Sequence, residues 1–208
     1  MKLALETPTN LLRQIQPLTD FDFILAHWVL EDEEYAQHYQ RSTRFKILDN
    51  STNELLVPCS MKDMKKAAEI VSPDWIVAPD FLGDASKTLE AIKSMESWWS
   101  IYSTMPVVQG ATLEEAKECA KGIAQTFSRI SIPYDITKSR EDPVTVLAEG
   151  RWAVLEAIAP LFSTIHLLGF NTVEEISRVA AFQPKVESLD TGVPVMMGLN
   201  KRPMVELM

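Results

Sequence analysis

The sequence has few cysteines and histidines and no long apolar run, and each shortage argues against a class of protein. The two cysteines, Cys59 and Cys119, are too few for a disulfide framework, and neither lies in a CxxC motif or a Cys/His cluster. The three histidines, His27, His38 and His166, are scattered, so we expect no metal site. No segment approaches roughly eighteen consecutive apolar residues, and the start of the chain has too short an apolar stretch for a secretory signal. We therefore expect a cytoplasmic protein with no membrane partner.

Familiar functional motifs and positive charge are also scarce. The chain has no GxGxxG, Walker A, HExxH or GxSxG pattern. It carries 20 Lys and Arg against 29 Asp and Glu, which gives a net charge of -9. This balance argues against binding to nucleic acid through overall basicity and leaves only a local basic patch. The candidates for such a patch, each more often an ordinary surface charge, are Lys138, Arg140, Arg151, Lys185, Lys201 and Arg202.

Length and composition indicate one domain. The chain has 208 residues, of which 46% are hydrophobic, enough for one sizeable core and too few for two comfortable domains. No internal repeat, low-complexity tract or Gly/Ser linker divides it. We therefore treat residues 1–208 as a single domain.

Apolar segments alternate with helix-forming segments along the chain. The segments predicted to be strands are 21–30, 45–50, 75–80, 107–109, 129–134, 164–169 and 186–190. Helices are expected between them, with capping signals at Ser60, at Asp84 or Ser86, and at Thr112, and a short helix is expected over 7–16. This alternation predicts an α/β fold of the TIM-type (β/α)8 barrel class. The eighth unit is not obvious: either 204–207 supply a short last strand, or the unit is truncated and another segment or subunit closes the barrel.

Polar residues stand at the ends of four of these segments. Asp49, Asp80, Gln109 and Asp190 each follow a short apolar run. Because the carboxyl ends of parallel strands lie at one edge of a sheet, these side chains are expected to converge. A single Asp in such a position is more often a helix cap or a turn former, but four in one order favour a functional site.

The same segments resemble a known family. The ordered set is LDN (48–50), APDFLGD (78–84), VVQGATLEE (107–115), ISIPYD (130–135), IHLLGF (165–170) and ESLDTGVP (187–194). This set spans most of the chain and resembles the tRNA-guanine transglycosylase superfamily, above all its phage and bacterial branch that inserts 7-deazaguanine derivatives into DNA. The resemblance implies a TIM-type barrel and a base-exchange reaction that requires no metal or redox cofactor.

The resemblance also implies a role for each polar residue. Asp190 matches the family's nucleophile, and Asp49 matches the acidic residue that takes part in proton transfer and contacts the substrate. Asp80 matches the aspartate that hydrogen-bonds the purine-like base. Gln109, followed by Gly110, matches the glutamine that reads the base carbonyl.

Other residues are implied as parts of the base pocket. The backbone near Ile132 and Pro133 is expected to contact the base, and Leu168, beside Gly169, to pack on its plane. These assignments depend on the motifs ISIPYD and IHLLGF.

Three side chains have two readings each. Phe81 and Tyr134 are candidates for the wall of a pocket that receives an extruded base, although aromatic residues near strand ends more often belong to the core. His166 is either a substrate contact or an ordinary buried strand histidine.

Elementary chemistry supports such a set of residues. Exchange of a base by double displacement needs one carboxylate as the nucleophile and a second acid or base for the proton. A guanine edge offers N–H donors beside a carbonyl acceptor, which suits one Asp acceptor together with one Gln donor.

Two departures from the family pattern bear on the substrate. The turn after the second predicted strand reads DNST (49–52), where the tRNA enzymes have a DSGG-type turn, so Asp49 lies in a different turn from its counterpart in the tRNA enzymes. The zinc-binding C-terminal part of the tRNA enzymes is absent, which favours DNA over tRNA as the substrate.

Three functions stay open at this point. The first is a DNA guanine transglycosylase that exchanges guanine in DNA for a free 7-deazaguanine base, such as 7-cyano-7-deazaguanine, in the host cytoplasm if a phage encodes it. The second is a partner-dependent or non-catalytic barrel subunit, suggested by the missing eighth unit; a homodimer is also open. The third is a nucleoside or base hydrolase on the same scaffold.

Overall fold

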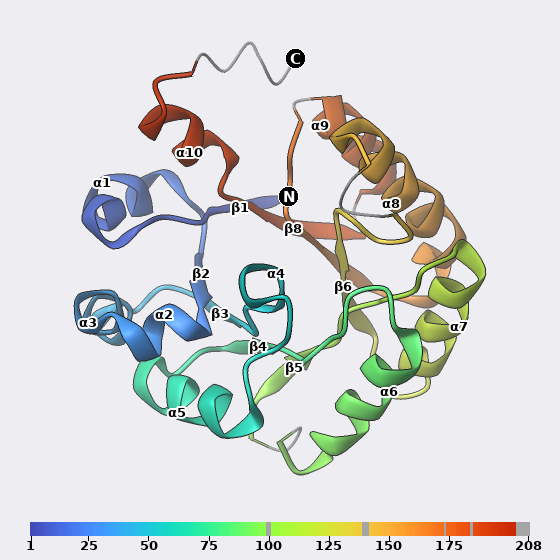
Figure 1. Cartoon of the computed structure of the whole chain (residues 1–208), viewed down its shortest axis with the longest axis horizontal. Helices are drawn as coiled ribbons and strands as arrows, with labels where there is room; N and C mark the ends of the chain where they lie inside the picture. The colour runs from blue at the N-terminus through green and yellow to red at the C-terminus, as the bar shows by residue number, and fades with distance from the viewer. Residues whose placement is uncertain (99–100, 139–141, 173, 184, 203–208) are drawn as a thin grey trace.

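Two four-stranded parallel sheets form the centre of the computed structural model, which describes residues 1–98, 101–138, 142–172, 174–183 and 185–202. The first sheet has the order β1 (Lys2–Leu5), β8 (Val186–Thr191), β7 (Thr164–Leu168), β6 (Arg129–Pro133). The second has the order β2 (Asp22–Leu25), β3 (Lys46–Asp49), β4 (Trp75–Val77), β5 (Ser103–Met105). The strands lie at the centre of the molecule and the helices lie around them (Figure 1).

Backbone hydrogen bonds link the two sheets at one side. Val107 pairs in parallel with Ser131 of β6; the Val108 N–H donates to the Ser131 carbonyl at 3.0 Å, and the Ser131 N–H donates to the Pro106 carbonyl at 2.8 Å. Because the pairing within each sheet and across this bridge is parallel, the strands end on the same side of the structure.

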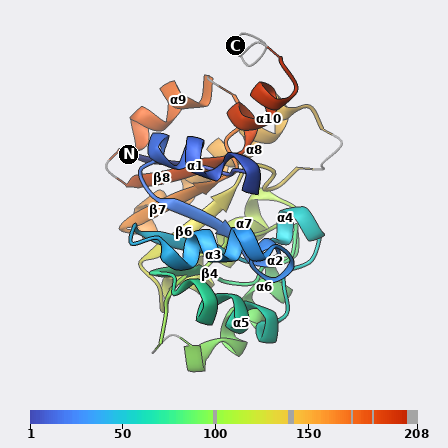
Figure 2. The ribbon, with the colours of Figure 1, turned by 90° about the vertical axis from the view of Figure 1, so that its left-hand side faces the viewer.

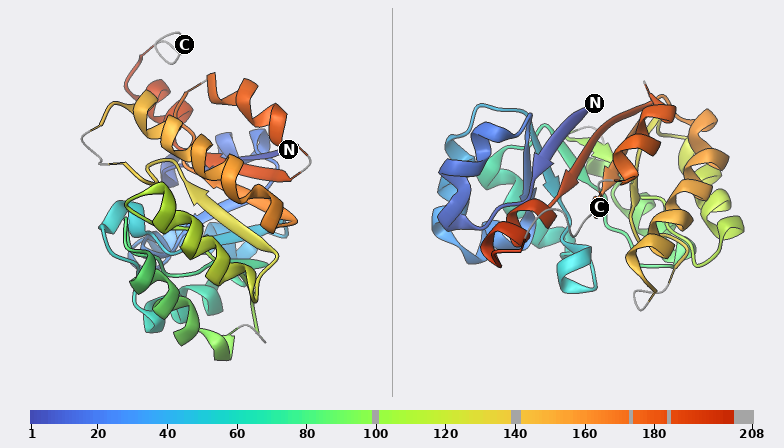
Figure 3. Two further views of the ribbon diagram at one scale, coloured as in Figure 1. Left: turned by 90° about the vertical axis from the view of Figure 1, so that its right-hand side faces the viewer. Right: turned by 90° about the horizontal axis from the view of Figure 1, so that it is seen from above.

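Helices follow the strands. They are α1 (Leu12–Ile15), α2 (Ala26–Glu31), α3 (Glu33–Arg41), α4 (Thr52–Leu55), α5 (Met61–Val71), α6 (Ala85–Ser94), α7 (Leu113–Ala124), α8 (Val144–Ile158), α9 (Glu174–Val179) and α10 (Val193–Leu199). Figure 2 shows α2, α3 and α5 along one flank, and Figure 3 shows α6, α7 and α8 along the opposite one. In the part of the chain that the structure describes, no helix has the length and apolar character needed to cross a membrane.

The predicted starts of three helices are confirmed. The side chains of Ser60, Asp84 and Thr112 each accept a hydrogen bond from the backbone N–H three residues on, at the first turns of α5, α6 and α7. The helix expected over 7–16 is instead a short α1 between two 3-10 turns, and α4 and α10 were not predicted.

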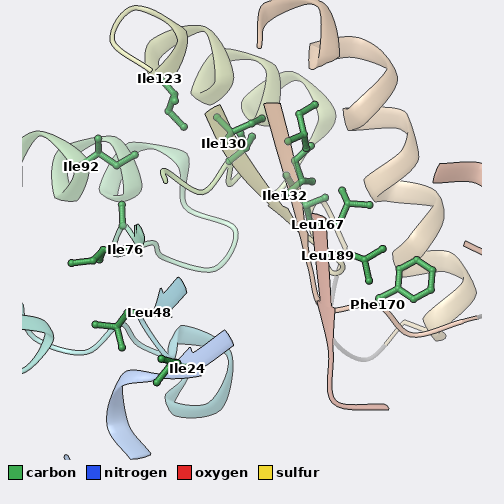
Figure 4. Packing of buried hydrophobic residues seen from close by; sticks show 14 of the residues in the cluster. Ile24, Leu48, Ile76, Ile92, Ile123, Ile130, Ile132, Leu167, Phe170 and Leu189 are labelled. Atoms are coloured by element: carbon green, nitrogen blue, oxygen red, sulfur yellow. The ribbon is translucent and has the colours of Figure 1, made fainter. Parts of the chain in front are cut away.

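Apolar side chains are buried on both faces of the strands. Ile24 and Leu48 point into the larger cluster, between sheets and helices, while Phe23 and Ile47, their neighbours along the strands, belong to a smaller cluster. Figure 4 shows the larger cluster, with Ile24 and Leu48 near one another. The strands are therefore held from both sides, which fixes the positions of the side chains at their ends.

The first predicted strand, 21–30, is too long. β2 ends at Leu25, and α2 begins at Ala26, where His27 and Val29 are also buried. A continuous apolar run does not distinguish a strand from a buried helix by its periodicity, so the pattern gave no boundary.

The fourth predicted strand, 107–109, is displaced. The strand that pairs with β4 is β5, which ends at Met105, and Val107 forms only an isolated bridge. Pro106 lies between them and has no N–H for a sheet hydrogen bond, which explains the interruption.

Of the alternatives left open for the eighth unit, the structure shows another segment beside β8, because β1 at the start of the chain is an eighth strand. It pairs with β8 in a register that sets Ala4 opposite Asp190 and Leu5 opposite Thr191. A four-residue strand is a weak sequence signal. The alternative strand at 204–207 lies outside the described residues.

Candidate functional site

A pocket opens where the strands end. Its empty volume, including the part open to solvent, is about 510 Å³. The predicted site residues that line it are Asp49, Asp80, Gln109, Pro133, Tyr134, Leu168, Gly169 and Asp190. The structure therefore brings all four polar strand-end residues to one place.

Asp190, at the end of β8, is almost fully buried, and each of its two carboxylate oxygens has a hydrogen-bond donor. Its Oδ1 lies 2.9 Å from Nε2 of His166, and its Oδ2 accepts a hydrogen bond from the Gly169 N–H at 3.2 Å. Burial raises the pKa of the Asp190 carboxyl to about 6, against the lowering effect of its hydrogen bonds. At neutral pH Asp190 is thus a carboxylate held in a fixed orientation.

His166 is neutral in this arrangement. Burial, with a smaller contribution from the nearby Arg151, lowers the pKa of its imidazole to about 3. Its Nδ1 lies 2.8 Å from the Ser188 hydroxyl. The network assigns the tautomer in which Nε2–H donates to Asp190 and Nδ1 accepts from Ser188. The imidazole is stacked on Phe23, with ring centroids 5.7 Å apart, so its plane is fixed as well.

Asp80 and Gln109 are bonded to each other. Nε2 of Gln109 donates to Oδ2 of Asp80 at 2.6 Å, and the Gly83 N–H donates to Oε1 of Gln109 at 3.1 Å. The other Asp80 oxygen accepts a hydrogen bond from Nδ2 of Asn50 at 2.7 Å. Burial raises the pKa of the Asp80 carboxyl and these hydrogen bonds oppose the rise. Asp80 and Gln109 thus present a preset acceptor and amide at the pocket wall.

Asp49 begins the DNST turn. Its Oδ2 accepts the Ser51 N–H at 2.7 Å, and Ser51 has a left-handed backbone with φ 61°. That conformation favours glycine, so this turn has the shape that a glycine would adopt most easily. The pKa of Asp49 lies well above its ordinary value, first because it is buried and then because the Glu54 carboxylate lies nearby.

Gly169 is required by close packing. It has φ +65°, and a Cβ built on it would lie 2.8 Å from a ring carbon of Tyr134. The carbonyl groups of Leu168 and Gly169 accept hydrogen bonds from Nη1 of Arg151, at 3.1 and 2.6 Å. The loop beside Asp190 is therefore fixed both by its backbone shape and by a buried guanidinium.

Arg151 is not a surface charge. Its side chain is fully buried and forms an ion pair with Glu175, which is also buried. Lys185 is likewise bound, through Nζ, to the carbonyl groups of Ala159 and Phe162. Arg151 and Lys185 are therefore not available for a basic patch on the surface. Arg140 lies outside the described residues.

Four predicted site residues lie elsewhere. Ile132 belongs to the apolar core and Phe81 is not among the lining residues, where the neighbouring Leu82 is found. Gly110 packs against the start of α7, where an added Cβ would lie 2.4 Å from a backbone nitrogen. His166 holds Asp190 from behind and does not line the pocket.

Glu6 is a pocket residue that the sequence analysis missed. It follows β1 directly, and its N–H donates to the Thr191 carbonyl at 3.0 Å. The signal is present in the sequence, since KLALE (2–6) is another short apolar run that ends in an acidic residue. Glu6 was not recognised as a strand-end residue because the strand before it was not predicted.

The pocket is strongly acidic. Six carboxyl side chains line it, from Glu6, Asp49, Glu54, Asp80, Asp135 and Asp190. Among its described lining residues there is no Lys or Arg, so it suits a ring with several N–H donors better than a phosphate. Within the described ranges, no group of three or more His, Cys, Asp and Glu side chains is arranged to hold a metal ion.

Comparison of the sequence with models of protein families and with curated proteins finds no match.

Proposed function

We propose that this chain is a DNA guanine transglycosylase, which exchanges guanine in DNA for a free 7-deazaguanine base. The observation that carries the proposal is the convergence of Asp49, Asp80, Gln109 and Asp190 in one pocket. These are the residues on which the resemblance to the transglycosylase superfamily rests. We further propose that the two parallel sheets form one closed (β/α)8 barrel, joined at the Val107–Ser131 bridge.

Asp190 is the nucleophile in this proposal. One of its carboxylate oxygens attacks C1′ of the target nucleoside, the C1′–N9 bond breaks, and guanine leaves with the bonding electrons. Hydrogen bonds from His166 and from the Gly169 N–H hold the carboxylate in place. The product of this half-reaction is an ester between Asp190 and the sugar, which the incoming base then displaces.

Asp49 supplies and recovers the proton. Burial and then the nearby Glu54 carboxylate raise its pKa well above the ordinary value, which favours the protonated form that can give a proton to the departing guanine. The incoming 7-deazaguanine returns a proton to it as its N9 attacks C1′. Two carboxyl groups therefore take different roles, Asp190 as the nucleophile and Asp49 as the acid and base.

Asp80 and Gln109 recognise the base. An Asp80 oxygen has lone pairs left for the N–H donors of a guanine-like edge, and the Gln109 amide lies beside it to meet the carbonyl. A neighbouring hollow shares Glu6, Tyr134 and Gly169 with the pocket and includes Arg202, which offers the flanking strand a positive charge.

The test is incubation of the protein with DNA containing labelled guanine, with and without 7-cyano-7-deazaguanine. Mass spectrometry follows guanine release, nucleoside composition and a protein–DNA ester. Asp190→Ala is the test variant, and Glu187→Gln, an exposed carboxylate on the same strand, is the control.

We expect deazaguanine-dependent exchange and a trapped ester with the native protein and with Glu187→Gln, and neither with Asp190→Ala. Release of guanine without incorporation identifies a hydrolase instead. If the folded protein exchanges no base in DNA or in tRNA, the transglycosylase proposal is wrong. The alternative of a partner-dependent subunit was suggested by a missing eighth strand. Because β1 is an eighth strand, that argument no longer holds.

A further inference from the structure

Glu6 places a third carboxyl group beside the nucleophile. β1 pairs with β8 so that Ala4 lies opposite Asp190, and the chain continues in the same direction to Glu6. The Glu6 N–H still bonds to β8 through the Thr191 carbonyl. The Glu6 side chain runs past Gly192, where an added Cβ would lie 3.6 Å from its Cβ and Oε2. Glu6 is therefore fixed by the sheet and not by a loose loop.

The carboxyl groups of Glu6 and Asp190 line the same pocket, close enough that a hydrogen bond between them shifts the pKa of each. A hydrogen bond between two carboxyl groups needs one proton between them, because two carboxylates have only acceptors. Burial and the neighbouring Asp190 raise the pKa of Glu6 well above its ordinary value, and the hydrogen bond between the two groups raises the pKa of Glu6 while it lowers that of Asp190. The proton thus belongs to Glu6, which donates, and Asp190 accepts.

We propose that Glu6 is a positioning residue for the Asp190 nucleophile, to which its protonated carboxyl group donates a hydrogen bond. The catalytic part of this inference rests on the proposed function, in which Asp190 is the nucleophile. With His166 and Gly169, Glu6 completes a set of three donors around Asp190, which come from the residue after β1, from β7 and from the loop after β7.

The hydrogen bond favours the carboxylate form of Asp190 before attack. When Asp190 becomes an ester, it loses its negative charge and accepts the hydrogen bond more weakly, while the proton stays on Glu6. When the incoming base displaces the ester, Asp190 leaves as a carboxylate and the strong hydrogen bond forms again. The same donor therefore stabilises Asp190 both before the first displacement and as the leaving group of the second.

Two variants of nearly equal size separate the hydrogen bond from the shape of the side chain. Glu6→Gln keeps an N–H donor, and Glu6→Met fills the same space with none. Carbon-13 NMR of labelled aspartate carboxyl groups follows the titration of Asp190 in the full chain, with Asp190→Asn to assign the signal. Urea unfolding shows that each variant is folded.

We expect Asp190 to titrate near pH 6 in the native protein and in Glu6→Gln, and about one to two pH units higher in Glu6→Met. The acidic limb of the base-exchange rate should move by the same amount. Equal titration in all three proteins overturns the inference, as does an equal shift in both variants. If Glu6→Met does not fold, Glu6→Ala is measured with the same expectation.

The NMR titration needs no substrate. It therefore decides the role of Glu6 even if the native protein exchanges no base, and loss of the proposed function would be seen separately in the exchange assay.

Discussion

The imidazole Nε2 of His166 lies 2.9 Å from Oδ1 of Asp190, and both side chains are almost entirely buried. They come from neighbouring strands, β7 and β8, which also bring His166 opposite Ser188 in the sheet register. The carboxylate is thus oriented by a neutral ring that is itself held by a hydroxyl group. Unlike a mobile surface pair, this contact fixes one oxygen of the proposed nucleophile.

His166→Phe tests that contact. A phenyl ring retains the packing on Phe23 but leaves Asp190 Oδ1 without one of its donors. An unsatisfied buried acceptor is costly, so the free energy of unfolding at pH 7 should fall by about 1–3 kcal/mol. Urea denaturation measures this. A variant as stable as the native protein would show that the hydrogen bond contributes little.

The loss of stability in His166→Phe should also depend on pH, which provides a second prediction. His166 takes a proton in the unfolded chain below its ordinary pKa of 6.5, but in the folded protein only near pH 3, so the native protein loses stability as pH falls through this window. Asp190, with its pKa raised to about 6 from 3.8, acts in the opposite direction between those values. The two effects oppose each other in the native protein, and His166→Phe retains only the second.

The difference in the free energy of unfolding between the native protein and His166→Phe should therefore become smaller from pH 6 to pH 4, by up to about 1.4 kcal/mol per pH unit. Urea denaturation across this range measures it. Phe23→Leu serves as the control, because it weakens the same packing without removing a titratable group. A deficit that is constant with pH would contradict the neutral state of His166.

The sequence predicted the alternation of strands and helices well where local signals were strong. Ser60 and Thr112 mark helix starts because their side chains replace a missing backbone partner within the same turn. The strand at β1 was missed because four residues carry little periodic signal, and its stability comes from pairing with β8, which is distant in the chain. The end of β2 was missed because Ala26 and its neighbours are buried on all sides.

The polar residues of the pocket were predictable from the sequence, but the buried residues that hold them in place were not. Asp190 and Asp80 end apolar runs, a pattern visible in the sequence. Arg151 appears there as one charge among many, and its burial depends on Glu175, which lies on a different helix. Such a pair is a tertiary relationship with no local pattern.

Arg151→Met tests that buried pair. The change leaves Glu175 charged without its partner and frees the carbonyl groups of Leu168 and Gly169. Removal of one member of a buried ion pair typically costs about 3–5 kcal/mol, and urea denaturation should show a loss of this size.

The exposed pair of Arg178 and Glu149 is the matched control, and Arg178→Met should cost less than about 1 kcal/mol. Adding Glu175→Gln to Arg151→Met should recover part of the loss, because the neutral amide can still accept from the Asn171 N–H. Equal losses for the two arginine variants would contradict a structural role for the buried pair.

Asp80→Asn tests recognition of the base. The amide places a donor where Asn50 or Gln109 already donates, so it disrupts the preset acceptor as well as the contact with the ligand. Binding of 7-cyano-7-deazaguanine, measured by calorimetry, should weaken by about 1–3 kcal/mol, roughly 5- to 150-fold. Asp84→Asn, at a half-exposed helix cap, is the control and should bind normally. Unchanged affinity in Asp80→Asn would remove this residue from the base site.

Asp49→Asn separates proton transfer from nucleophilic attack. The amide oxygen can still accept from the Ser51 N–H, so the turn should be retained, but no proton is available for guanine. Loss of a general acid typically lowers a rate about 10²- to 10⁴-fold, and single-turnover base release from DNA should show such a fall. A 7-methylguanine nucleotide already carries a positive charge on the base and leaves without a proton. Its release should therefore be almost unaffected by Asp49→Asn and abolished by Asp190→Ala, whereas equal loss of both substrates in Asp49→Asn would contradict the acid role.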